Sequence, residues 1–208
     1  GPGGHSFSAF GRPSAIHAMG RAIAAIAELR PPADPKTTFT VGVVSGGSSV
    51  NSIAAEAKLL MDMRSNRETE LLEIEARFFD ILKKAAADEN ARWNSDKIAV
   101  QTKLVGNRPA GVQPSDSAIV QAAWASTQAI GQTPNLGTGS STDSNLPISL
   151  GIPAVTLSGG GKGDNNHSLD EWFDPTDAYL GPQRALLTIL GLTGVEGATA
   201  PLLPRRKR

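Results

Sequence analysis

The chain has 208 residues, of which 39% are hydrophobic and 19% are charged, with 20 basic and 20 acidic side chains. This composition excludes a disordered, collagen-like or coiled-coil chain, and the zero net charge gives no reason to expect a nucleic acid or an anionic membrane as partner. Without cysteine, a metal site would use histidine and carboxylate ligands, and the apolar runs are far shorter than the roughly 20 residues of a membrane helix.

The chain opens with the glycine-rich turn Gly1-Pro2-Gly3-Gly4, without a Met and without a basic, apolar leader. A domain seldom begins in such a turn. We therefore expect either that residues have been removed upstream or that a cloning remnant precedes the domain. The lack of cysteine is compatible with both the cytoplasm and the periplasm, and we expect a cytoplasmic protein.

Hydrophobic periodicity and turn residues predict five elements in the first half of the chain. They are a helix at 13–30, a strand at 37–45, a strand at 55–64, a helix at 67–90 and a strand at 98–105. The two helices are expected to cover one face of an antiparallel sheet. One further strand before Gly1 would complete the β-α-β-β-α-β order of a ferredoxin-like sandwich, so we predict that α+β fold for residues 1–107.

Two finer features of this half follow from residue patterns. Alternation places Phe39, Val41 and Val43 on one face of the first strand. Ser65 and Glu68 have the spacing of a capping box, which predicts that they begin the second helix together.

The second half changes character after a linker at 106–111 that contains an Arg-Pro pair. The pattern predicts a helix at 114–130, capped by Gly131, then a short apolar strand at 152–157 and a last helix from about residue 181. Helices with so few strands indicate an α/β portion whose sheet is too small to stand alone. We therefore divide the chain into residues 1–107 and 108–208.

Polar and glycine-rich residues gather in four places, and each has an ordinary structural explanation beside a functional one. His5 lies in a glycine turn, where most histidines are simply exposed, and Arg64 has Asp62 available as an ion-pair partner. The other two places are the turn Gly139-Ser140-Ser141-Thr142-Asp143 and the segment 165–172 around His167. Glycine and hydroxyl residues before a helix can bind an anion through backbone N–H groups, but such turns are common.

In this order and spacing, however, the segments resemble the zinc metallopeptidase and amidohydrolase family of peptidase T, carboxypeptidase G, acetylornithine deacetylase and succinyl-diaminopimelate desuccinylase. The glycine turn at the start and the loop at 165–167 look nearer to the peptidase T-like branch of this family. The segments that carry the resemblance are Gly3-Gly4-His5-Ser6, 46–53, Met61-Asp62-Met63-Arg64, Ser141-Thr142-Asp143, 151–155 and 167–172.

This resemblance implies a fold and an activity. Residues 1–107 would be the ferredoxin-like lid, which forms a homodimer, and 108–208 would be the C-terminal portion of an α/β zinc-hydrolase catalytic domain. The full-length enzyme would use two zinc ions to hydrolyse the amide bond of a small peptide or an N-acyl amino acid. The segments that supply most zinc ligands and the general base in this family have no counterpart here, so the fragment would bind no zinc tightly and would be inactive.

The resemblance also implies residue roles. His5 would donate a hydrogen bond to the oxyanion in the partner subunit's site, and Asn51 and Arg64 would bind the substrate's carboxylate or backbone, both near one edge of the lid. His167 would be a zinc ligand whose second ring nitrogen is held by Asp170 or Glu171. The pocket would be lined by Ser141, Thr142 and Asp143.

Two other functions stay open at this point. A serine hydrolase could use Ser140 or Ser141 with His167 and Asp170, but the chain lacks the G-x-S-x-G turn that presents such a nucleophile. Alternatively, residues 1–107 could act as a stand-alone ferredoxin-like dimerisation module without catalysis.

Overall fold

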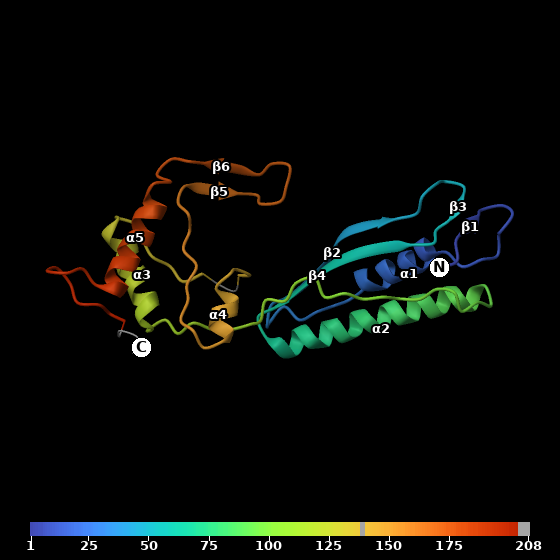
Figure 1. The fold of residues 1–208 in the computed structure, drawn as a ribbon, viewed down its shortest axis with the longest axis horizontal. Helices are drawn as coiled ribbons and strands as arrows, with labels where there is room; N and C mark the ends of the chain where they lie inside the picture. Colours follow the sequence, from blue (N-terminus) through green and yellow to red (C-terminus); the bar gives the residue numbers. More distant parts are fainter. Residues whose placement is uncertain (138–139, 204–208) are drawn as a thin grey trace. The chain divides into compact units, whose positions relative to one another are not determined.

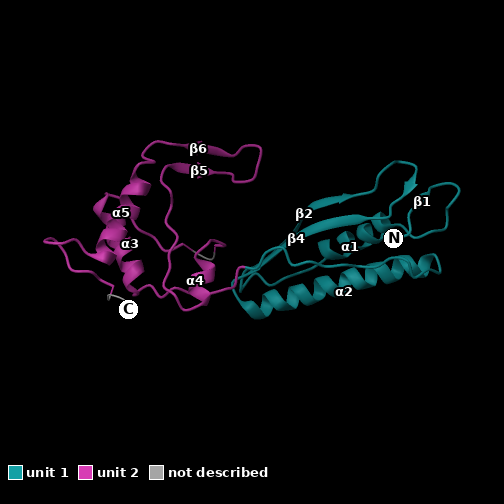
Figure 2. Ribbon diagram, in the orientation of Figure 1, with its two compact units in different colours: residues 1–107 teal, residues 108–208 magenta. Residues whose placement is uncertain are grey.

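A computed structural model describes residues 1–137 and 140–203. The chain divides into two compact units, Gly1–Asn107 and Arg108–Arg208 (Figure 2). Among the described residues, no helix is both long and apolar enough to span a membrane. Each unit combines helices with small antiparallel sheets, which confirms the mixed α/β class predicted from the sequence.

The first unit is built on an antiparallel hairpin covered by two helices (Figure 1). Both helices lie on the same side of the hairpin, as predicted. A second, very short strand pair joins the start of the chain to the loop between the hairpin strands. In chain order the elements are β1 (Gly4–His5), α1 (Ala15–Ala27), β2 (Thr37–Gly46), β3 (Ser52–Ile53), β4 (Ala57–Ser65) and α2 (Glu68–Arg92).

The core of this unit lies between the helices and the inner face of the hairpin. Apolar side chains at helical spacing are buried on both helices, which explains why these segments fold as helices. Ile26 is 1% exposed and is the largest apolar side chain that is almost fully buried. The buried core side chains of the two helices are Ala18, Ala22 and Ile26 on α1 and Ile74, Phe78, Ala85 and Ala86 on α2.

The hairpin departs from simple alternation at one point. The register between β2 and β4 shifts between Val41 and Val43, which is a β-bulge, and Val43 pairs with Leu60. Because a bulge turns the following side chains, Val43 is 51% exposed and does not share the inner face with Phe39 and Val41. The prediction for Val43 was therefore wrong.

The capping box predicted for Ser65 and Glu68 was also wrong. Ser65 is the last residue of β4, where its hydroxyl lies 2.9 Å from the hydroxyl of Thr37 on the paired strand. The hydroxyl of Ser65 also accepts a hydrogen bond from the backbone N–H of Arg67 at 3.2 Å. Arg67, and not Ser65, is the residue at the N-cap of α2. The spacing of Ser65 and Glu68 resembled a capping box, but Ser65 belongs to the end of a strand.

The strand predicted at 98–105 is not present. Ile98 is buried, but its backbone N–H and C=O are paired with the side-chain amide of Asn90 on α2, at 2.9 and 3.0 Å. The residues that follow it to 107 are exposed and form no ladder with another strand. The segment has the alternating apolar pattern of a strand, but no neighbouring strand pairs with it, and only Ile98 is anchored.

The second unit contains α3 (Ala118–Ala129), α4 (Asn145–Ser149), β5 (Lys162–Asp164), β6 (Trp172–Asp174) and α5 (Leu180–Thr193). Helices α3 and α5 pack on each other, and β5 and β6 form a three-residue antiparallel pair. Gly131 ends α3 with φ 76° and donates its N–H to the carbonyl of Gln128, as predicted for a C-terminal glycine.

No strand forms at 152–157, contrary to the prediction. Within the part of the chain that the structure describes, no neighbouring strand accepts its backbone bonds, and the N–H of Ala154 is bound by the side chain of Gln113 at 3.0 Å. The apolar sequence is thus present without a sheet. Several apolar side chains of this unit remain exposed, among them Leu146, Leu150, Ile152, Leu186 and Ile189.

Candidate functional site

The glycine turn at the start of the chain presents His5 at the surface of the first unit. Gly3 and Gly4 have φ values of 68° and 143°, which residues with a Cβ rarely adopt. A Cβ on Gly4 would lie 2.8 Å from the Cβ of Ala9. The two glycines therefore let the chain turn sharply around an exposed imidazole.

The imidazole of His5 is held by its own loop. Its Nδ1 accepts hydrogen bonds from the backbone N–H groups of Phe7, at 3.3 Å, and Ser8, at 3.5 Å. The carbonyl of His5 accepts from the N–H of Ala9 at 2.9 Å, which closes the loop. The side chain is thus exposed and fixed by short-range contacts.

The pairing of β1 with β3 brings Asn51 next to this loop. His5 lies opposite Ser52, and the N–H of Ser6 donates to the carbonyl of Asn51 at 2.9 Å. The side-chain oxygen of Asn51 accepts a hydrogen bond from the hydroxyl of Ser49 at 2.6 Å, and the Asn51 side chain is exposed. Two predicted site residues that are far apart in the sequence are therefore neighbours in the fold.

Arg64 does not join them. It lies near the end of β4 opposite Thr38, whereas the other end of the hairpin, where Gly46 pairs with Ala57, adjoins the loop with Asn51. The seven residue steps from Ala57 to Arg64 correspond to about 23 Å of strand. The expectation that Asn51 and Arg64 lie near one edge was wrong, while the ion pair of Arg64 with Asp62 is present at 2.7 Å.

The residues Ser141, Thr142 and Asp143 form the turn that leads into α4. Arg108 donates to the carbonyl and hydroxyl of Ser141, at 3.4 and 3.5 Å, and lies 3.7 Å from the carboxylate of Asp143, which is fully exposed. Gly139, the first residue of the predicted anion turn, lies outside the described residues. From the sequence we expected Arg108 to lie in a linker, because no local pattern indicates a contact with a residue 33 positions away.

Thr142 is committed to the structure of this turn. Its backbone N–H donates to the side chain of Asn145 at 2.8 Å, and its hydroxyl accepts from the N–H of Ser144 at 3.2 Å. The same hydroxyl accepts from the hydroxyl of Thr156 at 2.8 Å, which ties α4 to the segment after it. These contacts make a stable turn, and among residues 141–143 Asp143 alone is exposed.

His167 lies in the loop between β5 and β6, with φ 67°. Its backbone N–H donates to the carboxylate of Glu171 at 3.4 Å, and its side chain is exposed. Glu171, one of the two candidates for holding the His167 ring, thus contacts its backbone. The other candidate, Asp170, accepts a hydrogen bond on its carbonyl from Asn165 at 3.4 Å.

The donor set for a metal ion is incomplete in the described residues. No three His, Asp or Glu side chains among residues 1–137 and 140–203 gather closely enough to hold one. A catalytic zinc ion takes about three protein ligands, and His167 supplies one imidazole. The described residues by themselves therefore do not make up a complete zinc site.

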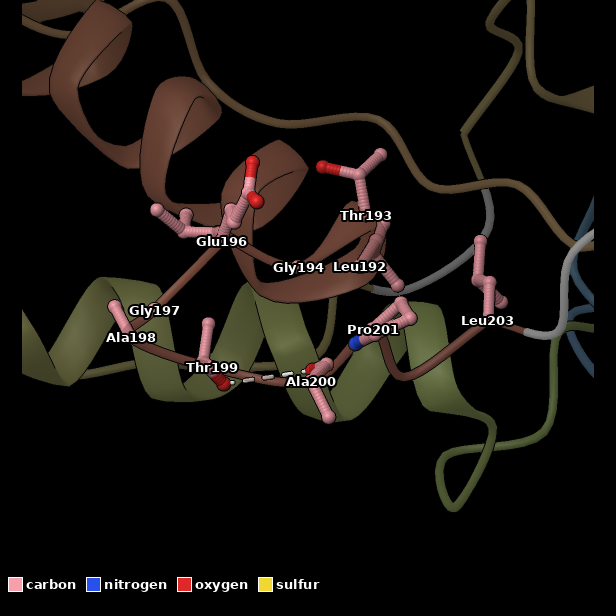
Figure 3. Close-up of a pocket in the computed structure, with 11 residues that line it drawn as sticks. Leu192, Thr193, Gly194, Glu196, Gly197, Ala198, Thr199, Ala200, Pro201 and Leu203 are labelled. Carbon is pink, nitrogen blue, oxygen red and sulfur yellow. Dashed lines mark hydrogen bonds between the residues drawn. The ribbon is translucent and has the colours of Figure 1, made fainter.

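One pocket of the structure lies away from every predicted site residue. It has a volume of about 830 Å³ and lies at the end of α5, lined by residues 192–201 and Leu203 (Figure 3). Glu196 is its single titratable side chain among otherwise small, apolar or hydroxyl residues. We assign no chemistry to it.

The comparison of the sequence with known families gives a direct match. Residues 1–90 match the family described as the peptidase dimerisation domain. The resemblance to the metallopeptidase and amidohydrolase family is thereby confirmed at the level of the family. A search of curated protein sequences finds no significant match.

Solved structures of several hydrolases share the fold of this chain. A tripeptidase from Staphylococcus aureus matches with a TM-score of 0.60 and 21% identity over 90% of this chain and 48% of its own. The aminopeptidase PepT from Bacillus cereus matches with a TM-score of 0.53 and 19% identity over the same shares. AtUAH in complex with (S)-hydroxyglycine matches with a TM-score of 0.64 and 17% identity over 90% of this chain and 43% of its own. The chain thus spans about half the length of these structures.

Proposed function

We propose that this chain comprises the lid, residues 1–107, and the C-terminal part of the catalytic domain, residues 108–208, of a zinc-dependent peptidase or amidohydrolase. The observation that carries the proposal is the match of residues 1–90 to the peptidase dimerisation domain. The substrate would be a small peptide or an N-acyl amino acid, and the protein would act in the cytoplasm. The likeness in fold to a tripeptidase and an aminopeptidase over 90% of the chain supports this class of reaction.

In this proposal His5 stabilises the oxyanion that forms when the amide bond is attacked, and it does so in the partner subunit's site. The separation of about 23 Å along β4 supports the second part, because an extended tripeptide spans only about 10 Å. A small substrate held by Arg64 therefore cannot also contact His5 of the same lid. Asn51, which adjoins His5, would serve the same site as His5, and Arg64 would bind a carboxylate through its planar guanidinium group.

His167 is proposed as one zinc ligand, and Ser141, Thr142 and Asp143 as part of the substrate pocket. The remaining metal ligands and the general base would come from the portion of the catalytic domain that this chain does not span. Two zinc ions, when bound there, would supply the activated water. The Arg108 contacts that hold the turn at Ser141 support a preorganised pocket wall.

A dimer is expected to form through α1 and the free edge of β2. Within the described residues β2 pairs with β4 alone, so its other edge offers unpaired backbone groups to a second copy. Val44, near the end of β2, is 51% exposed, and a lysine there should weaken such pairing. We predict that Val44→Lys raises the dimer dissociation constant at least about tenfold, which light scattering over a concentration series measures.

The control is Leu72→Lys, which adds the same charge at an exposed position of α2. It should leave the dissociation constant within about twofold of the unchanged chain. A monomer at the highest concentrations, or equal effects of the two substitutions, would contradict this interface.

The chain alone should neither hydrolyse peptides nor bind zinc tightly, because His167 is a single ligand without companions among the described residues. Titration calorimetry with zinc should give an affinity no higher than that of an exposed histidine, unchanged within error in His167→Ala. The full-length parent, assayed in parallel, should bind zinc and hydrolyse peptides in a zinc-dependent way. Stoichiometric tight binding, or turnover by this chain alone, would refute the proposed division of the site.

A second candidate function is a stand-alone dimerisation module without catalysis. It is favoured by one observation, that the family match covers the dimerisation domain and ends at residue 90. The same pair of assays separates the two functions: a full-length parent without hydrolytic activity would leave dimerisation as the role of residues 1–107.

A further inference from the structure

The hydrogen bonds to His5 determine more than its position. A neutral imidazole has one N–H donor and one acceptor nitrogen, and the bond made by one nitrogen decides which of them carries the proton. Here the backbone N–H groups of Phe7 and Ser8 both point at Nδ1. A proton on Nδ1 would face two other N–H hydrogens, so Nδ1 is the acceptor.

We propose that the loop of residues 4–10 fixes neutral His5 in the tautomer with its proton on Nε2, through the backbone N–H groups of Phe7 and Ser8. The exposed nitrogen of the ring is then a hydrogen-bond donor. Because Nε2 already carries a proton, neutral His5 cannot remove one from a substrate or from water through that atom. Phe7 and Ser8 are positioning residues, which act through His5.

The loop is braced well enough to hold this tautomer. The N–H of Ser6 is bound to the carbonyl of Asn51 at 2.9 Å, and the N–H of Phe10 to the carbonyl of Phe7 at 3.3 Å. The ring of Phe10 contacts Trp93 edge-on, with centroids 5.5 Å apart, which ties the loop to the end of α2. These contacts keep the two N–H groups aimed at Nδ1.

The consequence for catalysis rests on the proposed function. An oxyanion needs a donor that is in place before the charge develops, since reorienting a group during the reaction costs free energy. A histidine without this bracing exchanges between two tautomers and offers a donor at Nε2 for only part of the time. The loop removes that exchange. The Nε2–H group of His5 can then donate to an anionic or carbonyl oxygen, and it cannot form a hydrogen bond with another donor.

His17 provides an internal contrast. Its Nδ1 lies 3.6 Å from a carboxylate oxygen of Glu89, and a carboxylate can only accept. A carboxylate at this distance favours a proton on the facing Nδ1 of His17, whereas the two backbone N–H groups at His5 favour an Nδ1 without a proton. With His167, the chain has three histidines in all, so a spectrum of the labelled rings is simple to assign.

The test is a long-range ¹H–¹⁵N NMR spectrum of the 208-residue chain with labelled histidine, recorded at about pH 8, above the ordinary pKa of a histidine side chain. His17→Gln and His167→Gln assign the signals. His5 should show an acceptor-type shift at Nδ1 and a donor-type shift at Nε2, both farther apart than in the same chain unfolded in urea. His5 shifts equal to those in urea, or a donor-type shift at Nδ1, would overturn the proposal.

A variant isolates the role of the loop. Gly4→Ala places a Cβ 2.8 Å from that of Ala9 at a φ of 143°, and so displaces the loop. Its His5 shifts should move toward the urea values, whereas Gly20→Ala, whose Cβ meets no atom within 4 Å, should leave them unchanged. Unmoved shifts in a folded Gly4→Ala chain would refute the role of the loop; if that variant does not fold, the spectrum of the unchanged chain decides.

This test does not depend on hydrolysis. An inactive full-length parent would refute the proposed function and leave the His5 tautomer standing. A freely exchanging His5 in an active parent would refute the tautomer and leave the function standing.

Discussion

His5→Ala in the full-length parent should lower kcat for peptide hydrolysis by about 100- to 1,000-fold, with a much smaller change in KM. The loss corresponds to one hydrogen-bond donor that acts on the charge developing in the transition state, and it falls on kcat because the ground-state carbonyl needs that donor far less. Steady-state kinetics on the purified enzyme measures both constants.

Two controls test the chemistry of this loss. His5→Gln keeps a side-chain N–H donor in the same loop and should lose less than His5→Ala. Ser8→Ala removes a hydroxyl but keeps the backbone N–H that contacts His5, and it should leave kcat within about threefold of the unchanged enzyme. Equal losses in all three variants would assign the effect to a disturbed fold instead of a missing donor.

Mixing subunits tests whether His5 serves its partner. A dimer of one His5→Ala subunit and one His167→Ala subunit contains one site with an intact metal ligand and an intact His5 from the other subunit, if His5 acts across the interface. Part of the activity should then return on mixing two inactive variants. No recovery, with mixed dimers shown to form, would mean that His5 serves its own site.

The features that the sequence predicted correctly are those decided over short distances along the chain. The helices and the hairpin follow from local spacing of apolar residues, as in Ile74 and Phe78 on α2, which are buried one turn apart. The ion pair of Asp62 with Arg64 follows from two residues on the same face of one strand. Gly131 ends a helix because a φ of 76° is open to glycine.

The features that were wrong depend on partners elsewhere in the chain. Two segments, 98–105 and 152–157, have the alternating or apolar pattern of strands. A strand also needs a neighbouring strand, and the periodicity of one segment does not show whether such a neighbour exists. The bulge at Val43 depends on the register of β2 against β4, which local alternation does not contain.

The candidate site divides in the same way. The glycines before His5 predicted an unusual turn. The contact of this loop with Asn51 could not be predicted in that way, because it comes from the pairing of β1 with β3. The distance of Arg64 from that loop comes from the length of β4. The contacts of Glu89 were missed entirely, because a glutamate on a helix of mixed charge is usually exposed.

Glu89 is the buried carboxylate on which the first unit should depend most. Its side chain is 0% exposed. It accepts hydrogen bonds from the N–H of Ser14 at 3.1 Å, from Arg21 at 3.2 Å and from the ring N–H of Trp93 at 3.1 Å, and His17 lies 3.6 Å away. One side chain thus links the start of α1 to the end of α2.

Glu89→Leu should lower the free energy of unfolding of this unit by about 3 kcal/mol, since it leaves several donors without their acceptor in a buried place. Glu73→Leu, at an exposed position of the same helix, should change it by less than about 0.5 kcal/mol. Urea unfolding followed by the fluorescence of Trp93, in a background with Trp124→Phe and Trp172→Phe, measures both. Similar midpoints for the two variants would show that the buried contacts contribute nothing.

The same carboxylate makes the stability depend on pH in a defined direction. Burial by itself would raise the pKa of Glu89, but the hydrogen bonds from Ser14, Arg21 and Trp93, together with the charge of His17, lower it more, so the pKa lies below its ordinary value of 4.5.

A carboxylate with a lowered pKa stabilises the folded state fully above its unfolded pKa and loses that contribution as the pH falls through its folded pKa. The difference in unfolding free energy between the wild-type chain and Glu89→Gln, which keeps the shape but has no charge to titrate, should therefore be retained down to about pH 5 and shrink below about 4.5. Urea unfolding at a series of pH values measures it, and a difference that stays constant down to about pH 3 would mean that the charge of Glu89 does not stabilise the fold.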